Sequence, residues 1–456
     1  MDDDLNIIRR QYRYRDDLSL LFDYKSGRYH RLDNESARLI VRWAMAGATF
    51  SSILDRLMHT FEIDFELAAR DASDFIRQLS VLDHSSNDAE WFGVDKGFSE
   101  PNIRFPLRVE FELTALCNYK CGFCYNVWKI DPNLSDREVR EHVKGFPEKH
   151  LNMKLIERLL RECSINGAHS IRYSGGETTL YPQLLDVLDI GCQERLYQTI
   201  FTNGHLISED RARMWEERNV RCVLISLHGP KEVHDRLVGY PGSYERVKRS
   251  AQILRSYGIE VVIEYALVHA NASLVRETLD DVVSWNVTEF RVMRYVPTGK
   301  HDDKYGVPLD GTFQTIQSLD DVLQASASKV RVGWPCGQKI CTSETDKPLM
   351  KDDPTMPARL RQLTGSCESG LTWCSVSFDG KLRNCPHSNV FFGDLNNESI
   401  AQVWARLNRE VSRILEPREG CSSCSVLGQC KGGCHLPKLI RPAAQGVPLA
   451  SISRAR

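Results

Sequence analysis

Residues 107–125 have the sequence LRVEFELTALCNYKCGFCY, in which a predicted strand over Leu107–Leu113 leads into a loop with three cysteines. The cysteines are spaced as Cys117-x3-Cys121-x2-Cys124. Three closely spaced thiolates can each bind one iron of a four-iron cluster, which leaves the fourth iron open to another ligand. A structural zinc site usually has four protein ligands, whereas this loop offers three. Zinc stays an alternative, but the loop favours an iron–sulfur cluster.

From about residue 105 to residue 297, strand-like apolar segments alternate with segments of helical periodicity. This order predicts a parallel sheet with right-handed crossovers, and catalytic groups at the carboxyl ends of its strands. We therefore expect an α/β fold, with a partial (β/α)6 barrel at its centre. The six expected strands are Leu107–Leu113, Ser170–Ser174, Gln198–Thr202, Cys222–Leu227, Glu260–Val268 and Glu289–Tyr295.

Polar motifs follow four of these strands in order. They are Ser174–Glu177 (SGGE), Thr202–Gly204 (TNG), Ser226–Gly229 (SLHG) and Asn271. Glycines in the first motif let the backbone approach a ligand closely, and the carboxylate of Glu177 can pair with an ammonium group. Each motif alone could be an ordinary turn or helix cap. Their succession at neighbouring strand ends indicates one binding site.

The cysteine loop, with Tyr125 after Cys124, resembles the signature of the radical S-adenosylmethionine superfamily. The resemblance implies a [4Fe-4S] cluster on the three cysteines, whose open iron binds S-adenosyl-L-methionine. It also implies reductive cleavage of that molecule to a 5′-deoxyadenosyl radical that abstracts hydrogen from a substrate. Candidate general bases are Glu264, His269 and His387. The cofactor contacts that the resemblance implies are Tyr125, Gly175, Gly176, Glu177, Asn203, Ser226, His228 and Asn271.

A second set of cysteines lies toward the C-terminus, upstream and downstream of a predicted hairpin turn at Asp379-Gly380. The set resembles the SPASM extension of the radical family, which holds two auxiliary iron–sulfur clusters. One further cysteine expected downstream is missing, so we expect an incompletely ligated second cluster, or a ligand from His435, Cys336 or Cys341. Zinc stays an alternative here too. The resemblance assigns Cys367, Cys374, Cys385 and Cys434 to one cluster, and Cys421, Cys424 and Cys430 to the other.

The N-terminal residues 1–88 are expected to form a small independent unit. Leu20 and Phe22 lie on one strand of a predicted hairpin that turns at Ser26-Gly27, and three amphipathic helices follow. The pattern is winged-helix-like and resembles the leader-peptide recognition (PqqD-like) domain of pyrroloquinoline quinone biosynthesis. A hairpin edge of this kind can take an extended peptide as an added strand.

A DNA-binding winged helix is the alternative for this unit. It would use Arg9, Arg10, Arg13 and Arg15 on phosphates, but five aspartates surround them.

Composition supports a protein of the reducing cytoplasm. Lys and Arg number 59 against 61 Asp and Glu, so no global charge favours nucleic acid or a membrane. The charged N-terminus has no signal sequence, and no apolar run is long enough to span a bilayer. In a reducing compartment the 15 cysteines favour metal ligation over disulfides. The expected domains are 1–88 for peptide recognition, a linker over 89–104, the radical SAM barrel over 105–300, a connection over 301–335 and the SPASM-type domain over 336–456.

Together these features predict a maturase of ribosomally synthesised precursor peptides that installs a thioether or carbon–carbon crosslink. A reductant such as flavodoxin or ferredoxin would supply electrons. One alternative is an enzyme that oxidises a protein side chain, like the anaerobic sulfatase maturases. Those enzymes carry an acidic residue after the hairpin cysteine, where Pro386 stands here. The other alternative is a binding protein for zinc or an iron–sulfur cluster without catalysis.

Overall fold

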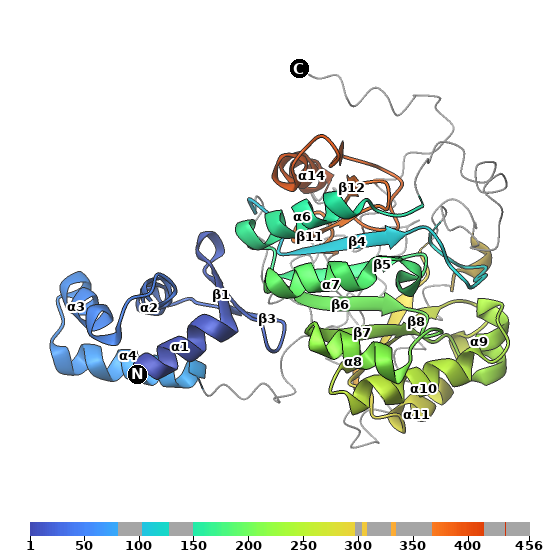
Figure 1. Ribbon diagram of the computed structural model, residues 1–456, viewed down its shortest axis with the longest axis horizontal. Coiled ribbons are helices and arrows are strands. Elements are labelled where there is room, and N and C mark those ends of the chain that lie inside the picture. The colour runs from blue at the N-terminus through green and yellow to red at the C-terminus, as the bar shows by residue number, and fades with distance from the viewer. Residues whose placement is uncertain are drawn as a thin grey trace, which may run out of the picture.

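The computed structural model describes residues 1–80, 103–126, 149–296, 303–307, 330–333, 367–414 and Cys434. Within these residues a three-stranded antiparallel sheet is followed by a ten-stranded, largely parallel sheet (Figure 1). This arrangement confirms the predicted α/β class. None of the described helices is both long enough and apolar enough to cross a membrane.

The N-terminal unit, residues 1–80, packs helices against the small antiparallel sheet, whose order is β1-β2-β3. The predicted hairpin is present as β2 and β3, and the three predicted helices follow it. The first helix and first strand are additions that the sequence pattern did not predict. The bounds are α1 Asp2–Gln11, β1 Tyr12–Arg15, a 3-10 turn Asp16–Leu18, β2 Leu20–Asp23, β3 Arg28–Arg31, α2 Glu35–Met45, α3 Phe50–Phe61 and α4 Phe65–Ser80.

Six parallel strands, β4 to β9, form the body of the large sheet and begin and end within two residues of the predicted strands. Helices connect them and cover one face of the sheet (Figure 1). The strands are β4 Arg108–Thr114, β5 Ser170–Gly175, β6 Tyr197–Thr202, β7 Val220–Ser226, β8 Glu260–Leu267 and β9 Glu289–Arg294. The helices are α6 Met153–Asn166, α7 Leu184–Gln193, α8 Glu209–Glu217, α9 Lys231–Val238, α10 Ser243–Ser256 and α11 Val275–Val283, with 3-10 turns at Thr178–Leu180, Ala272–Leu274 and Asp303–Tyr305.

The large sheet continues into the C-terminal region. The sequence pattern did not predict this continuation. Strand β11 pairs in parallel with β4, and β12 and β13 follow in antiparallel pairs. At the other edge, β10 pairs with β9. The predicted turn is confirmed between β11 and β12, where Gly380 has φ +82°. The bounds are β10 Arg331–Gly333, β11 Trp373–Val376, β12 Lys381–Arg383, β13 Gly393–Asp394 and α14 Ile400–Ile414.

The two faces of the large sheet differ in chemistry. On β4, Phe111 packs into the main core under the helices, whereas its neighbours Glu110 and Glu112 lie on the opposite, inner face. On β9, Arg291 and Glu289 form a buried ion pair of 2.5 Å. Because a buried charge is costly unless it is paired, the inner face depends on such specific partners.

The N-terminal unit is joined to the barrel by a buried interface, although the sequence suggested an independent unit. Strand β2 is buried along its whole length because both faces of its sheet are covered. Leu21 packs among the helices of the unit, whereas Phe22 packs against Tyr197 and Cys222 of the large sheet. The Phe22 ring also stacks on His169 at 5.4 Å between centroids.

Polar contacts reinforce this interface. Arg15, which is 5% exposed, donates to Gly167 O at 3.0 Å and to Phe105 O at 3.3 Å. A Cβ at Gly167 would lie 2.3 Å from Arg15 Cδ, so the close approach requires glycine. Tyr29 donates its hydroxyl hydrogen to Leu107 O at 2.9 Å. Most of the barrel residues in these contacts precede or begin strands, so the unit lies at the amino ends of the strands (Figure 1).

Candidate radical SAM site

The cysteine loop leaves the carboxyl end of β4, as predicted. Cys117 is buried, and Cys121 and Cys124 are partly exposed. Cys117 packs against Val238 at the end of α9, and Cys121 contacts the same apolar cluster. Phe123, which belongs to the loop, packs in a second apolar cluster with residues that follow β8 and β9. The loop is therefore held against several strand ends at once.

The glycines of the Ser174–Glu177 motif are required by the cysteine loop itself. A Cβ on Gly175 would lie 2.4 Å from Thr114 O, and a Cβ on Gly176 would lie 2.1 Å from Leu116 O. Gly175 also has φ +138°, which L side chains rarely adopt. Gly176 N donates to Thr114 O at 2.7 Å. The glycines therefore allow two backbone segments to approach closely, and the predicted contacts of Gly175 and Gly176 with the cofactor stay predictions.

Glu177 joins two of the predicted motifs. Its carboxylate is 1% exposed and accepts hydrogen bonds from Thr179, Thr202 and Asn203. The shortest are 2.6 Å from Thr179 Oγ1 and 2.7 Å from Thr202 Oγ1 and Asn203 N. Asn203 in turn donates its side-chain amide to Asn118 Oδ1 of the cysteine loop at 2.7 Å. The ends of β5 and β6 and the cysteine loop therefore form one hydrogen-bonded assembly.

His228, after β7, lies beside the cysteine loop with a defined tautomer. Its Nδ1 accepts a hydrogen bond from Ala266 N at 3.1 Å, so the proton of the neutral ring is on Nε2. Burial, followed by the neighbouring His234, lowers the pKa of His228 well below its usual range. The His228 ring meets Phe123 edge to face at 4.9 Å. His228 is therefore a neutral imidazole whose ring contacts the cysteine loop through Phe123.

Asn271 holds the backbone around His228 and Ala266 in place by hydrogen bonds. It is fully buried, and its amide donates to His228 O at 3.0 Å and to Ala266 O at 2.9 Å. Its Oδ1 accepts from Val268 N at 2.8 Å. Because both amide hydrogens are already bonded, the predicted direct cofactor contact of Asn271 is not supported. Ser226, the last residue of β7, is partly exposed and pairs in register with Glu264.

The donor chemistry suits the expected cluster, because the loop offers three thiols and no competing imidazole or carboxylate ligand between Cys117 and Cys124. Among the described residues, no group of three or more His, Cys, Asp or Glu side chains is close enough together to hold a metal ion. The roles of Cys117, Cys121 and Cys124 as ligands therefore stay predictions, which rest on donor chemistry and on their place at the strand ends.

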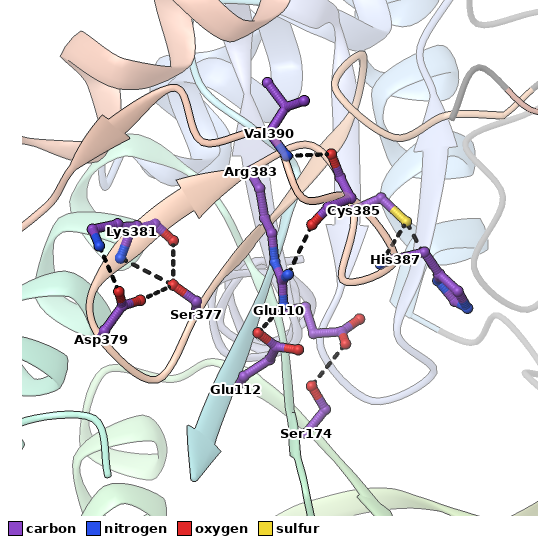
Figure 2. A network of polar contacts seen from close by, with 11 residues as sticks. Glu110, Glu112, Ser174, Ser377, Asp379, Lys381, Arg383, Cys385, His387 and Val390 are labelled. Atoms are coloured by element: carbon purple, nitrogen blue, oxygen red, sulfur yellow. Dashed lines mark hydrogen bonds and ion pairs between the residues drawn. The ribbon is translucent and has the colours of Figure 1, made fainter. Parts of the chain in front are cut away.

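A buried acidic pair on β4 was not predicted from the sequence. Glu110 accepts a hydrogen bond from Ser174 Oγ at 2.7 Å, and Glu112 forms an ion pair with Arg383 of β12 (Figure 2). Burial, which outweighs the attraction of Arg383 and is reinforced by Glu110, raises the pKa of Glu112 to about 7. Two carboxylates thus lie on the inner face shortly before the cysteine loop. Arg383 is 271 positions from Glu112 in the sequence, so no local pattern could identify it as the partner of Glu112.

The three candidate bases differ in environment. Burial raises the pKa of Glu264, although Arg291 and Arg172 oppose the shift. His269 is exposed. Burial and then Arg383 lower the pKa of His387 to about 4, so its ring is neutral near pH 7. The geometry therefore singles out no one of the three as a general base.

The C-terminal cysteines are only partly brought together in the described residues. Cys367 contacts Cys434, and this contact, with burial, raises the pKa of the Cys367 thiol. Cys367 Sγ also donates to Ser369 Oγ at 3.3 Å. Cys385 Sγ accepts a hydrogen bond from His387 N at 3.4 Å. These thiols suit an auxiliary cluster as donors.

Cys374 does not fit its predicted role. It lies within β11 and is fully buried in the main hydrophobic core, where burial raises the pKa of its thiol. Alternation along β11 places it with Val376 among the core side chains. The prediction that Cys374 is a cluster ligand is therefore not supported. The predicted ligands Cys421, Cys424 and Cys430, and the candidates Cys336, Cys341 and His435, lie outside the described residues.

Two of the arginines that the DNA-binding alternative would need are bonded within the protein. Arg15 is held by the barrel carbonyls described above. Arg9 donates to Ala44 O and Ala48 O within its own unit. Neither guanidinium is therefore displayed for a phosphate backbone.

The barrel matches a known protein family. A model of the Radical SAM superfamily matches residues 111–282, from β4 into α11. The Fe-coproporphyrin III synthase of Methanosarcina barkeri is 23% identical over 71% of this chain and 82% of its own length. The PqqA peptide cyclase of Rhodopseudomonas palustris is 22% identical over 78% of this chain and 86% of its own length.

Among solved structures, Streptococcus suis SuiB bound to its precursor peptide SuiA shares the fold. It superposes with a TM-score of 0.66 at 18% identity, and the match covers 94% of both chains. Residues 111–282 are thus a radical SAM domain.

Proposed function

We propose that this enzyme modifies a precursor peptide. The observation that carries the proposal is the extent of the fold shared with SuiB, which covers 94% of each chain and so includes the greater part of both additions to the barrel. The PqqA peptide cyclase, whose name also indicates a peptide substrate, matches 78% of this chain. We further propose that the product is a thioether or carbon–carbon crosslink.

The N-terminal unit is the proposed binding site for the leader of that peptide. Because the faces of its small sheet are covered by its own helices and by the barrel, only its edges are available to a partner. Within the described residues β3, Arg28–Arg31, is hydrogen-bonded to a strand on one side only. An extended leader could add to such an edge by main-chain hydrogen bonds.

The barrel supplies the radical chemistry. When bound, a [4Fe-4S] cluster with S-adenosylmethionine supplies a carbon radical that abstracts hydrogen from a substrate. Cys117, Cys121 and Cys124 would hold the cluster. Glu177 keeps two strand ends and the loop in register, and the ring of His228, whose proton is on Nε2, contacts Phe123 of the loop. Phe123 packs over the ends of β8 and β9 and helps to keep water out.

The C-terminal unit is proposed to hold the auxiliary clusters. Cys367, Cys385 and Cys434 would be ligands of the first auxiliary cluster. Because Cys374 is not counted as a ligand, that cluster would have three protein ligands instead of four. Cys421, Cys424 and Cys430 would serve the second. These clusters would accept the electron released when the substrate is oxidised.

A second candidate function is a step of heme synthesis, which is suggested by the name of another relative, the AdoMet-dependent heme synthase of Methanosarcina barkeri. That relative matches 72% of this chain, a smaller share than the SuiB fold covers. The N-terminal unit, docked on the barrel by a buried interface, is the feature that favours a peptide over a tetrapyrrole.

One experiment separates the two functions. The full chain, charged anaerobically with iron and sulfide, is incubated with dithionite, S-adenosylmethionine and either a short peptide encoded beside its gene or Fe-coproporphyrin III. Mass spectrometry should show the loss of two hydrogen atoms from the peptide, with no change when Cys121→Ala is used. Conversion of the tetrapyrrole with every tested peptide unchanged would contradict the proposal.

A further inference from the structure

A cross-domain ion pair connects the barrel with the C-terminal cysteine segment. Glu112 comes from β4, five residues before Cys117, and Arg383 comes from β12, two residues before Cys385. Their side chains are 1% and 0% exposed, and they are 271 positions apart in the sequence. The pair therefore forms only when the C-terminal strands are added to the sheet beside β4.

Arg383 also organises the turn that carries Cys385. Its Nη1 donates to Ser388 O at 2.9 Å, which closes the segment on the far side of Cys385 (Figure 2). The next residue, Asn384, donates its side-chain amide to Ser369 Oγ at 3.1 Å, and Ser369 Oγ accepts from Cys367 Sγ. One guanidinium and one amide thus fix the positions of two cysteines that are 18 residues apart in the sequence.

A second contact joins the two cysteine segments directly. Tyr125, which follows Cys124, packs its ring on His387, two residues after Cys385, with 4.3 Å between centroids. The segment of Cys385 is thus held at two points, by an ion pair and by a ring contact. A rigid connection of this kind fixes both the distance between the segments and the charge around them.

We infer that Glu112 and Arg383 are positioning residues that set the reduction potential of an iron–sulfur cluster on Cys385. The inference rests on the proposed auxiliary cluster of the C-terminal unit. The potential of such a cluster depends on nearby charge, hydrogen bonding and solvent exposure. Loss of Glu112 leaves the guanidinium of Arg383, which cannot lose its proton, as an uncompensated positive charge near the cluster.

The test is a potentiometric titration followed by electron paramagnetic resonance on the full chain, reconstituted with iron and sulfide and without substrate. Glu112→Gln should raise the midpoint potential of one cluster, because the positive charge of Arg383 is left unpaired. Arg383→Gln should shift it less, because the buried Glu112, whose pKa is already raised to about 7, then takes up a proton and leaves no charge. For Glu112→Gln we expect at least a tenfold change in the one-electron equilibrium, or about 59 mV.

Two controls separate positioning from stability. Arg406→Gln removes an exposed ion pair to Glu398, of 2.6 Å, in the same C-terminal unit and should leave the potential unchanged. The double variant Glu112→Met/Arg383→Met replaces the buried charges by apolar groups, which often restores stability. Its cluster spectrum should still differ from that of the wild type, because nothing directional holds the Cys385 segment.

Either of two results would overturn the inference. The first is an unchanged potential in both single variants. The second is full iron content in Cys385→Ala, which would mean that no cluster depends on Cys385. Neither result bears on peptide modification, so a failure of the inference is distinct from a failure of the proposed function. That function fails instead if no peptide is altered while the cluster potentials shift as expected.

Discussion

The barrel has two junctions, and they are built from different interactions. At the amino ends of the strands, the N-terminal unit docks mainly through aromatic packing around Phe22 and through bonds from Arg15 to backbone carbonyls. At the other junction, β11 of the C-terminal unit pairs with β4 and continues the sheet. The buried Glu112–Arg383 ion pair is a second link between this unit and β4. The first junction lies away from the cysteine loop, whereas the second lies close to it.

This difference suits two tasks. Apolar packing is non-directional and tolerates small shifts, so it can hold a binding unit in place without fixing each atom. A buried ion pair is costly unless its geometry is right, so it fixes the two strands that carry it. We interpret the N-terminal junction as an attachment and the C-terminal junction as a device for precise placement.

The largest effect is expected at the C-terminal junction. Arg383→Met leaves Glu112 buried without its partner and should cost about 3–5 kcal/mol of stability. The shift should appear in the urea concentration at the midpoint of unfolding, followed by circular dichroism. The double variant with Glu112→Met should regain most of the loss. If the single and double variants were equally destabilised, the pair would not be the link between the units.

A comparable but local effect is expected at the N-terminal junction. Phe22→Ala removes a fully buried ring and should cost about 3 kcal/mol, the lower end for such a truncation, because an interface can partly close. Limited proteolysis should release the unit earlier, while formation of 5′-deoxyadenosine without peptide stays at the wild-type rate. Phe65→Ala, at a ring that is 60% exposed, is the matched control. Loss of 5′-deoxyadenosine formation in Phe22→Ala would break the contrast between the junctions.

The pH dependence of stability sharpens the comparison further. Glu112 has a folded-state pKa of about 7, raised from 4.5, so the folded protein holds this proton more tightly than the unfolded chain. The resulting stability is present below about pH 4.5 and is lost as the pH rises toward 7. Relative to Glu112→Gln, the wild type should therefore lose about 1–3 kcal/mol over that window. A flat difference between the two proteins would contradict the raised pKa.

The smallest effect is expected at an exposed pair. Arg42 and Asp16 lie 2.6 Å apart in the N-terminal unit, and both side chains are about half exposed. Arg42→Gln should change the thermal unfolding midpoint by little, since such pairs contribute less than about 1 kcal/mol. A loss as large as that of Arg383→Met would mean that burial does not explain the strength of the second junction.

Local patterns were enough to predict the barrel from the sequence. Its strands are short apolar runs that end in turn motifs, and both signals are carried by neighbouring residues. The same signals placed Glu177, Asn203 and His228 at strand ends, where the structure joins Glu177 and Asn203 to the cysteine loop by hydrogen bonds and brings the ring of His228 against Phe123.

The features that were missed depend on contacts between distant residues or on burial. The pairing of β11 with β4 joins Trp373 to Arg108, and no local pattern could reveal it. Cys374 matched a ligand spacing, but its position in β11 directs its side chain into the hydrophobic core. The helix α1 has only Leu5 and Ile8 as buried residues among charged ones, so its apolar signal was weak.

The most direct test of the account is whether Cys117, Cys121 and Cys124 support the cleavage of S-adenosylmethionine. The reconstituted full chain is given dithionite and S-adenosylmethionine under nitrogen, and 5′-deoxyadenosine and methionine are quantified by chromatography. The account predicts that both products form with the wild type and that neither forms with a folded Cys121→Ala variant. An inactive wild type with a full iron content, or an active Cys121→Ala variant, would contradict it.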